Sequence, residues 1–132
     1  MLQIGVKAIF RNDEGLFLFI KRSSGYTQSN LDEVWDIPGG RLNERESLID
    51  ALKREITEEI GYTLTNIPKL LAAQDIFVEK KNLHVVRLTY LVNENVKDIK
   101  LSKEHSNYSW ISLDDLYTLN LDPYIKAVLE VL

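Results

Sequence analysis

Residues 40–62 read GRLNERESLIDALKREITEEIGY. A glycine opens this segment, and the acidic string REITEEIG occupies residues 54–61 near its end. Glu55, Glu58 and Glu59 are spaced i, i+3 and i+4, so a helix places their carboxylates on one side. Like charges at these spacings repel one another, and a positive partner is expected to compensate. Carboxylate oxygens suit a divalent metal, so the segment predicts a metal site.

Helical geometry places these carboxylates beside the buried stripe of the helix. At ~100° per residue, the apolar side chains cover an arc of about 120° that must face the core. These are Leu48, Ile49, Leu52, Ile56 and Ile60. The three glutamates occupy an adjoining arc of about 100°, where they would be partly desolvated and would point into a cleft. The alternative is a solvated face, which is what most charge runs are.

The residue types favour Mg²⁺ or Mn²⁺ as the metal. Flexible carboxylate oxygens suit these ions, whereas two histidines and no cysteines disfavour zinc. Gly39 and Gly40 stand between an expected strand and the acidic helix, where a backbone carbonyl could approach the same metal. Taken alone, the glycine pair is explained as well by a simple turn.

The composition predicts one ordinary globular domain spanning residues 1–132. The chain is 45% hydrophobic and 27% charged, which is enough apolar content for a buried core. Its net charge of −4 argues against a general nucleic-acid binder, although bound metal would allow a phosphate substrate. No apolar run reaches the length of a membrane span, and the lack of cysteine excludes disulfides and thiol catalysis. We therefore expect a cytoplasmic protein without membrane contact.

Hydrophobic patterning predicts strands on both sides of the acidic helix. A hairpin is expected from residues 4–10 and 16–21, then a loop at 23–32 and a short strand at 34–37 that the glycine pair stops. Ser47 with Asp50 begins the helix and Gly61 ends it. Further strands are expected after Pro68, at 83–92 and at 108–111, with a loop at 93–104, a turn at 113–116 and a helix at 123–132. This order predicts an α+β sandwich.

The segment from Gly40 to Tyr62 also resembles a complete Nudix box. Gly40 is followed after five residues by Glu46, and after seven more by REITEEIGY at residues 54–62. WDIPG at 35–39 resembles the family's approach strand, and WISLDDL at 110–116 resembles its late strand-to-helix segment. The resemblance covers essentially the whole chain. It implies an α/β/α sandwich around a mixed central sheet, and hydrolysis of a nucleoside diphosphate linked to a further group X.

The resemblance also implies roles for individual residues. Divalent cations would be bound by Glu55, Glu58 and Glu59, helped by the carbonyl of Gly40. Arg54 would orient a metal-binding glutamate through a salt bridge, and Glu46 would be structural or bind a further ion. Glu55 is the first choice for the general base. Glu104 matches a position where many members carry another metal-binding or base carboxylate; its alternative is an exposed loop acid.

The substrate is expected to be a plain or oxidised (deoxy)nucleoside triphosphate. Markers typical of ADP-ribose and dinucleoside polyphosphate members are missing around Phe77 to Lys80. Alternatives are a nucleotide sugar, a dinucleoside polyphosphate, an RNA cap, or a sensing domain without catalysis. The resemblance leaves a homodimer open, because many members dimerise.

Substrate contacts are predicted more weakly than metal contacts. Arg22, at the end of a strand, could contact a phosphate, although a solvated strand end explains it equally well. Asn120 could read the base with its amide, or cap the terminal helix. Base stacking is considered for Tyr26, Phe77 and Tyr90, which otherwise belong to a core. No role is assigned to His84 or His105.

Overall fold

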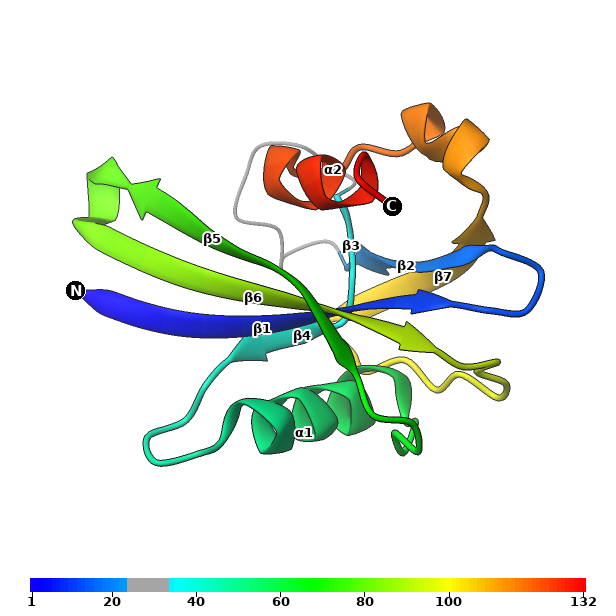
Figure 1. Cartoon of the computed structure of the whole chain (residues 1–132), viewed down its shortest axis with the longest axis horizontal. Helices are drawn as coiled ribbons and strands as arrows, with labels where there is room; N and C mark the ends of the chain where they lie inside the picture. The colour runs from blue at the N-terminus through cyan, green and yellow to red at the C-terminus, as the bar shows by residue number, and fades with distance from the viewer. Residues whose placement is uncertain (24–33) are drawn as a thin grey trace.

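A computed structural model describes residues 1–23 and 34–132, which form one mixed β-sheet with helices on both faces (Figure 1). The strands of these residues are β1 (Leu2–Arg11), β2 (Phe17–Arg22), β3 (Trp35–Asp36), β4 (Gly39–Arg41), β5 (Lys69–Val78), β6 (Leu83–Asn93) and β7 (His105–Ile111). Neighbouring strands follow the order β3-β2-β1-β6-β5, while β4 pairs with β1 and β7 with β2. The loop predicted at 23–32, with Tyr26, lies almost wholly outside the described residues.

Two hydrophobic cores hold the helices against the sheet. Helix α1 (Leu48–Ile60) covers one face and α2 (Pro123–Leu129) covers the other (Figure 1). Side chains alternate along β1, so Phe10 packs in the core that contains α1 and Ile9 in the core that contains α2. Each fully buried side chain of this size contributes roughly 1.5–3 kcal/mol. The predicted α/β/α sandwich, an α+β fold with a mixed central sheet, is confirmed.

The predicted N-terminal hairpin is confirmed only near its turn. In the described residues, β1 and β2 are in register at Arg11 and Phe17, next to a turn in which the Asn12 side chain accepts from the Leu16 N–H at 2.9 Å. On its other edge, β1 pairs in parallel with β6 along its whole length. At Gly5 to Lys7, β1 also pairs in antiparallel with β4. Because β4 takes the place beside β1, the sheet opens between β1 and β2.

The strand predicted at 34–37 ends before Pro38 as expected, since β3 covers Trp35–Asp36, but Gly39 and Gly40 do not form a simple turn, because both belong to β4. A Cβ atom on Gly39 would lie 2.1 Å from the backbone oxygen of Val6, and the residue has φ of 149°. Two backbones that approach this closely leave no room for a side chain. The glycine is therefore required by strand contact rather than by chain reversal.

Helix α1 begins and ends where its sequence predicts. The Ser47 hydroxyl accepts from the Asp50 N–H at 3.1 Å, and Gly61 ends the helix in the left-handed region with φ of 67°. Leu52, Ile56 and Ile60 are completely buried on the face toward the sheet. Glu59 is also buried, as expected for a side chain beside the apolar stripe.

The C-terminal half follows the predicted order with shifted boundaries. β5 is confirmed after Pro68 and continues to Val78, and β7 begins at His105 rather than Tyr108. Two short 3₁₀ helices occur, η1 (Glu79–Lys81) and η2 (Leu113–Thr118), and α2 ends at Leu129. Within the part of the chain that the structure describes, no helix has the length and apolar character needed to cross a membrane.

Candidate active site

A cleft of about 540 Å³ is lined by residues from β4, the second half of α1 and the segment that leads into β7. It brings together most of the residues predicted for the site: Arg22, Gly40, Glu55, Glu58, Glu59 and Glu104. The remaining two lie elsewhere. Arg54 stands beside the cleft and bonds to its carboxylates, whereas Asn120 is absent from the lining.

Arg54 organises the acidic side of the cleft. Its Nη1 donates to Glu55 Oε1 at 2.8 Å, and its other nitrogens hold both oxygens of Glu46 at 2.8 and 2.9 Å. Hydrogen bonds from Arg54 lower the pKa of the Glu46 carboxyl to about 2, and the pKa of Arg54 is itself raised. The described geometry thus agrees with an orienting role for Arg54 and a structural role for Glu46.

The three glutamates of α1 differ in their exposure to solvent. The side chain of Glu58 is 58% exposed, that of Glu55 is 14% exposed, and Glu59 is buried. Burial raises the pKa of the Glu59 carboxyl to about 8, against the opposing effects of the Lys7 charge and of the Gly39 N–H at 3.2 Å. A cation in the cleft would offset the cost of ionising this buried acid.

Gly40 forms a tight wall of the same cleft. A Cβ atom there would lie 2.6 Å from the carboxyl carbon of Glu55, so any side chain at this position would displace the carboxylate. The Gly40 carbonyl and the Glu55 carboxylate offer only oxygen atoms as metal ligands, and oxygen ligands suit a hard divalent cation. No group of three acidic or histidine side chains in the described residues is yet arranged to hold a metal, and Arg54 bonds to Glu55 and Glu58 instead.

Glu104 and His105 also line the cleft. Glu104 is an exposed side chain, and its backbone oxygen accepts from the Ser23 N–H at 2.8 Å. His105 is buried, and burial lowers the pKa of its imidazole. The sequence assigns no role to His105. The only signal for its place in the cleft is that it follows Glu104 directly.

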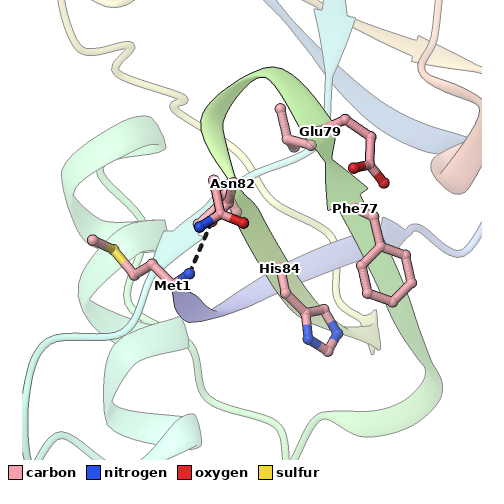
Figure 2. Close-up of a pocket in the computed structure, with 7 residues that line it drawn as sticks. Met1, Phe77, Glu79, Asn82 and His84 are labelled. Carbon is pink, nitrogen blue, oxygen red and sulfur yellow. Dashed lines mark hydrogen bonds between the residues drawn. The ribbon is translucent and has the colours of Figure 1, made fainter.

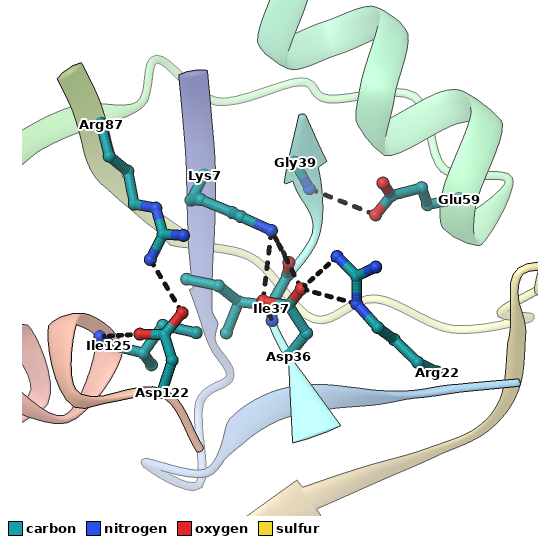
Figure 3. A network of polar contacts seen from close by, with 9 residues as sticks. All are labelled: Lys7, Arg22, Asp36, Ile37, Gly39, Glu59, Arg87, Asp122 and Ile125. Carbon is teal, nitrogen blue, oxygen red and sulfur yellow. Dashed lines mark hydrogen bonds and ion pairs between the residues drawn. The ribbon is translucent and has the colours of Figure 1, made fainter. Parts of the chain in front are cut away.

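A buried ionic network that the sequence does not predict adjoins the cleft (Figure 3). Lys7 Nζ lies 3.1 Å from both carboxylate oxygens of Asp36, and Arg22 Nη2 lies 3.1 Å from Asp36 Oδ2. Burial alone would raise the pKa of Asp36, but Lys7 and Arg22 together lower it to about 2. The sequence signal was Lys7 itself, the only charged residue in the apolar run 2–10.

A second pocket of about 370 Å³ meets the cleft at Arg22. Trp35 of β3, Arg87 of β6 and Asp122 before α2 line it, and Arg87 Nη1 donates to Asp122 Oδ2 at 3.0 Å (Figure 3). Asp122 also caps α2 by accepting from the Ile125 N–H at 2.8 Å. The prediction of Asn120 as the helix cap is therefore wrong; its backbone oxygen accepts from the Trp35 N–H at 3.1 Å.

Phe77 and Tyr90, two of the aromatic residues considered for base stacking, are absent from the cleft lining. Tyr90 is buried in the core that contains α1. Phe77 is exposed and stacks on His84, with ring centroids 4.5 Å apart, at the end of the β5–β6 hairpin. Figure 2 shows both side chains around a small pocket with Met1, Glu79 and Asn82, separate from the acidic cleft. Tyr26 lies outside the described residues.

The whole chain matches a known family. The model of the NUDIX domain matches residues 1–131, so the chain belongs to the Nudix family. It is a Nudix hydrolase, and enzymes of this family generally need a divalent metal.

Individual relatives agree with this assignment. The chain is 29% identical to an 8-oxo-dGTP diphosphatase of Buchnera aphidicola, over 75% of this chain and 77% of that protein. It is 30% identical to the nucleoside triphosphatase NudI of an Escherichia coli strain, over 74% of each. A crystal structure of a MutT protein from Methanosarcina mazei Go1 superposes with a TM-score of 0.84 at 33% identity, covering 98% of this chain and 91% of that one.

Proposed function

We propose that this Nudix hydrolase cleaves a pyrophosphate bond of a (deoxy)nucleoside triphosphate, with Mg²⁺ or Mn²⁺ as the metal. The observation that carries the proposal is the convergence of Gly40, Glu55, Glu58, Glu59 and Glu104 on one cleft. Two relatives named for nucleoside triphosphate or 8-oxo-dGTP hydrolysis support the substrate class. An oxidised nucleotide therefore belongs among the first substrates to test.

In this proposal the metal ligands are the Gly40 carbonyl and the carboxylates of Glu55, Glu58, Glu59 and Glu104. The ion would neutralise phosphate oxygens and increase the acidity of a bound water. Arg54 keeps Glu55 turned toward Gly40 through the 2.8 Å ion pair, and the Gly39 N–H keeps Glu59 Oε2 in place. Glu55 remains the first choice for the general base, and Glu104 is the second.

The remaining substrate would extend from the cleft toward the pocket that shares Arg22 with it. Arg22 stands at the junction, where a guanidinium can contact a phosphate oxygen. The second pocket offers the flat side chain of Trp35 and the donors of Arg87 to a nucleoside. Base reading by Asn120 remains a proposal, and Asn120 lines neither of the two pockets.

A broad hydrolysis screen tests this function. Plain and oxidised nucleoside triphosphates, nucleotide sugars, dinucleoside polyphosphates and capped RNA are incubated with Mg²⁺ or Mn²⁺, and products are identified by mass. We expect a nucleoside monophosphate and pyrophosphate from a triphosphate as the fastest reaction. Faster turnover of a nucleotide sugar, a dinucleoside polyphosphate or a capped RNA would move the substrate to that class.

A homodimer and a cytoplasmic location stay predictions. Light scattering tests the homodimer, and cell fractionation tests the location.

A further inference from the structure

Lys7 is a buried cation in a strand segment that is otherwise uncharged from Leu2 to Phe10. Only 8% of the residue is exposed. Its ammonium lies 3.1 Å from both oxygens of Asp36 and 3.3 Å from the backbone oxygen of Ile37 (Figure 3). Burying an unpaired lysine is costly, so this set of three acceptors fixes where the side chain can lie.

These contacts hold the chain that leads into β4. Asp36 and Ile37 come just before Pro38, whose backbone oxygen accepts from the Ala8 N–H at 2.8 Å. Lys7 is opposite Gly39 in the β1–β4 register, and a Cβ atom on Gly39 would lie 2.9 Å from Lys7 Cδ. The lysine side chain therefore packs over the first residue of β4 while its charge fixes the two residues before Pro38.

The same short segment presents two groups to α1. The Gly39 N–H donates to Glu59 Oε2 at 3.2 Å, and the Gly40 backbone lies against the carboxylate of Glu55. A small displacement of β4 would move both carboxylates relative to the Gly40 carbonyl. The geometry of the proposed metal ligands thus depends on what holds β4 in place.

We propose that Lys7 is a positioning residue for the metal site: through Asp36 and Ile37 it fixes the Gly39–Gly40 backbone against the acidic face of α1. The inference rests on the proposed function, because it takes Gly40, Glu55 and Glu59 as metal ligands. Lys7 also lines the second pocket, so its effect on the metal site is measured without nucleotide.

The test is Lys7→Met, which keeps an unbranched apolar side chain and removes the ammonium. Mn²⁺ is titrated calorimetrically into the metal-free protein without nucleotide. Partners that orient metal ligands typically contribute about 10- to 100-fold in metal affinity, so we expect Mn²⁺ binding to weaken by about tenfold or more. Lys7→Arg, which keeps the charge, should recover part of the lost affinity.

Arg11→Met is the matched control. It removes a cation from the same strand, where Arg11 Nε donates to the side-chain oxygen of Asn93 at 2.9 Å, outside the β1–β4 register. Mn²⁺ affinity should remain at the wild-type value in this variant. A general loss of stability would weaken Mn²⁺ binding in both variants, whereas a positioning role weakens it in Lys7→Met alone.

A folded Lys7→Met protein that binds Mn²⁺ as tightly as wild type would overturn the inference while leaving the proposed function intact. If wild type itself binds no Mn²⁺ and hydrolyses no nucleotide, the proposed function fails first. If Lys7→Met does not fold, Asp36→Asn answers the same question, because it keeps the side-chain volume and removes the charge that Lys7 holds. Weakened Mn²⁺ binding in Asp36→Asn supports the inference, and unchanged binding contradicts it.

Discussion

At the scale of single residues, the cleft is defined by how closely Gly40 passes Glu55. The distance of 2.6 Å from a Cβ atom at Gly40 to the Glu55 carboxyl carbon means that any side chain there displaces the carboxylate. The glycine therefore serves the site directly, in addition to allowing β4 to form. The cost of replacing it should appear in activity more than in stability, since the atom that must move ends a flexible side chain.

We predict that Gly40→Ala lowers kcat on the order of 10²-fold, because small misplacements of reacting groups have effects of this size. Steady-state kinetics and a thermal melt check this together. Gly5→Ala is the control, since a Cβ atom at Gly5 meets its nearest neighbour, the Gly40 oxygen, at an ordinary 3.6 Å. Equal kcat values in Gly40→Ala and Gly5→Ala would contradict the account of the Gly40–Glu55 wall.

Glu59 gives a prediction for the metal-free protein. The pKa of its carboxyl is raised from 4.5 to about 8 by burial, so the folded state retains a proton that the unfolded state releases. Stability from this group is fully present below pH 4.5 and is lost as pH rises toward about 8. In EDTA, the Tm of wild type should fall across this window relative to that of Glu59→Gln. A parallel pH dependence of the two proteins would refute the assignment to Glu59.

At the scale of secondary structure, α1 carries the acidic residues and its ends are fixed by local chemistry. Ser47→Ala removes the hydroxyl that accepts from the Asp50 N–H, which should cost about 1 kcal/mol of unfolding free energy. Urea denaturation measures this loss. The nucleotide KM and kcat should stay near wild type, because the cap lies at the opposite end of the helix from Glu58 and Glu59. A large loss of kcat in Ser47→Ala, with an unchanged free energy of unfolding, would contradict this purely structural role of the cap.

How much could be predicted depends on the range of the interactions. The helix, its caps and the clustering of its three glutamates follow from spacings within α1, and the sequence predicts them. The pairing of β1 with β6 joins residues about eighty positions apart, and no local pattern shows it. Strand β4 was missed because glycines that permit close strand contact have the same sequence signature as glycines in a turn.

The same limit applies to the site. Glu55, Glu58 and Glu59 could be placed from helical geometry, and Gly40 and Glu104 from the family resemblance. The Lys7–Asp36 ion pair could not be predicted from the sequence, because it joins side chains of two strands that are far apart in the chain. The cap at Asp122 was assigned to Asn120, since both residue types precede Pro123 and favour helix starts.

At the scale of the whole molecule, the two faces of the sheet carry different pockets. The face covered by α1 carries the acidic cleft, and the face covered by α2 carries the pocket with Arg87 and Asp122. Arg22 lines both the cleft and this pocket. The central claim is that the acidic cleft performs metal-dependent hydrolysis of a nucleoside triphosphate.

Glu58→Gln tests that claim most directly, because Glu58 is exposed and its replacement should leave the fold intact. Pyrophosphate release from a nucleoside triphosphate is measured with Mg²⁺, with Mn²⁺ and with EDTA, for wild type and for Glu58→Gln; Glu44→Gln, an exposed change in the preceding loop, is the control. The account predicts turnover by wild type and Glu44→Gln only with metal, and a loss of about a hundredfold or more in Glu58→Gln at an unchanged Tm. Turnover in EDTA, or near-wild-type turnover by Glu58→Gln, would contradict it.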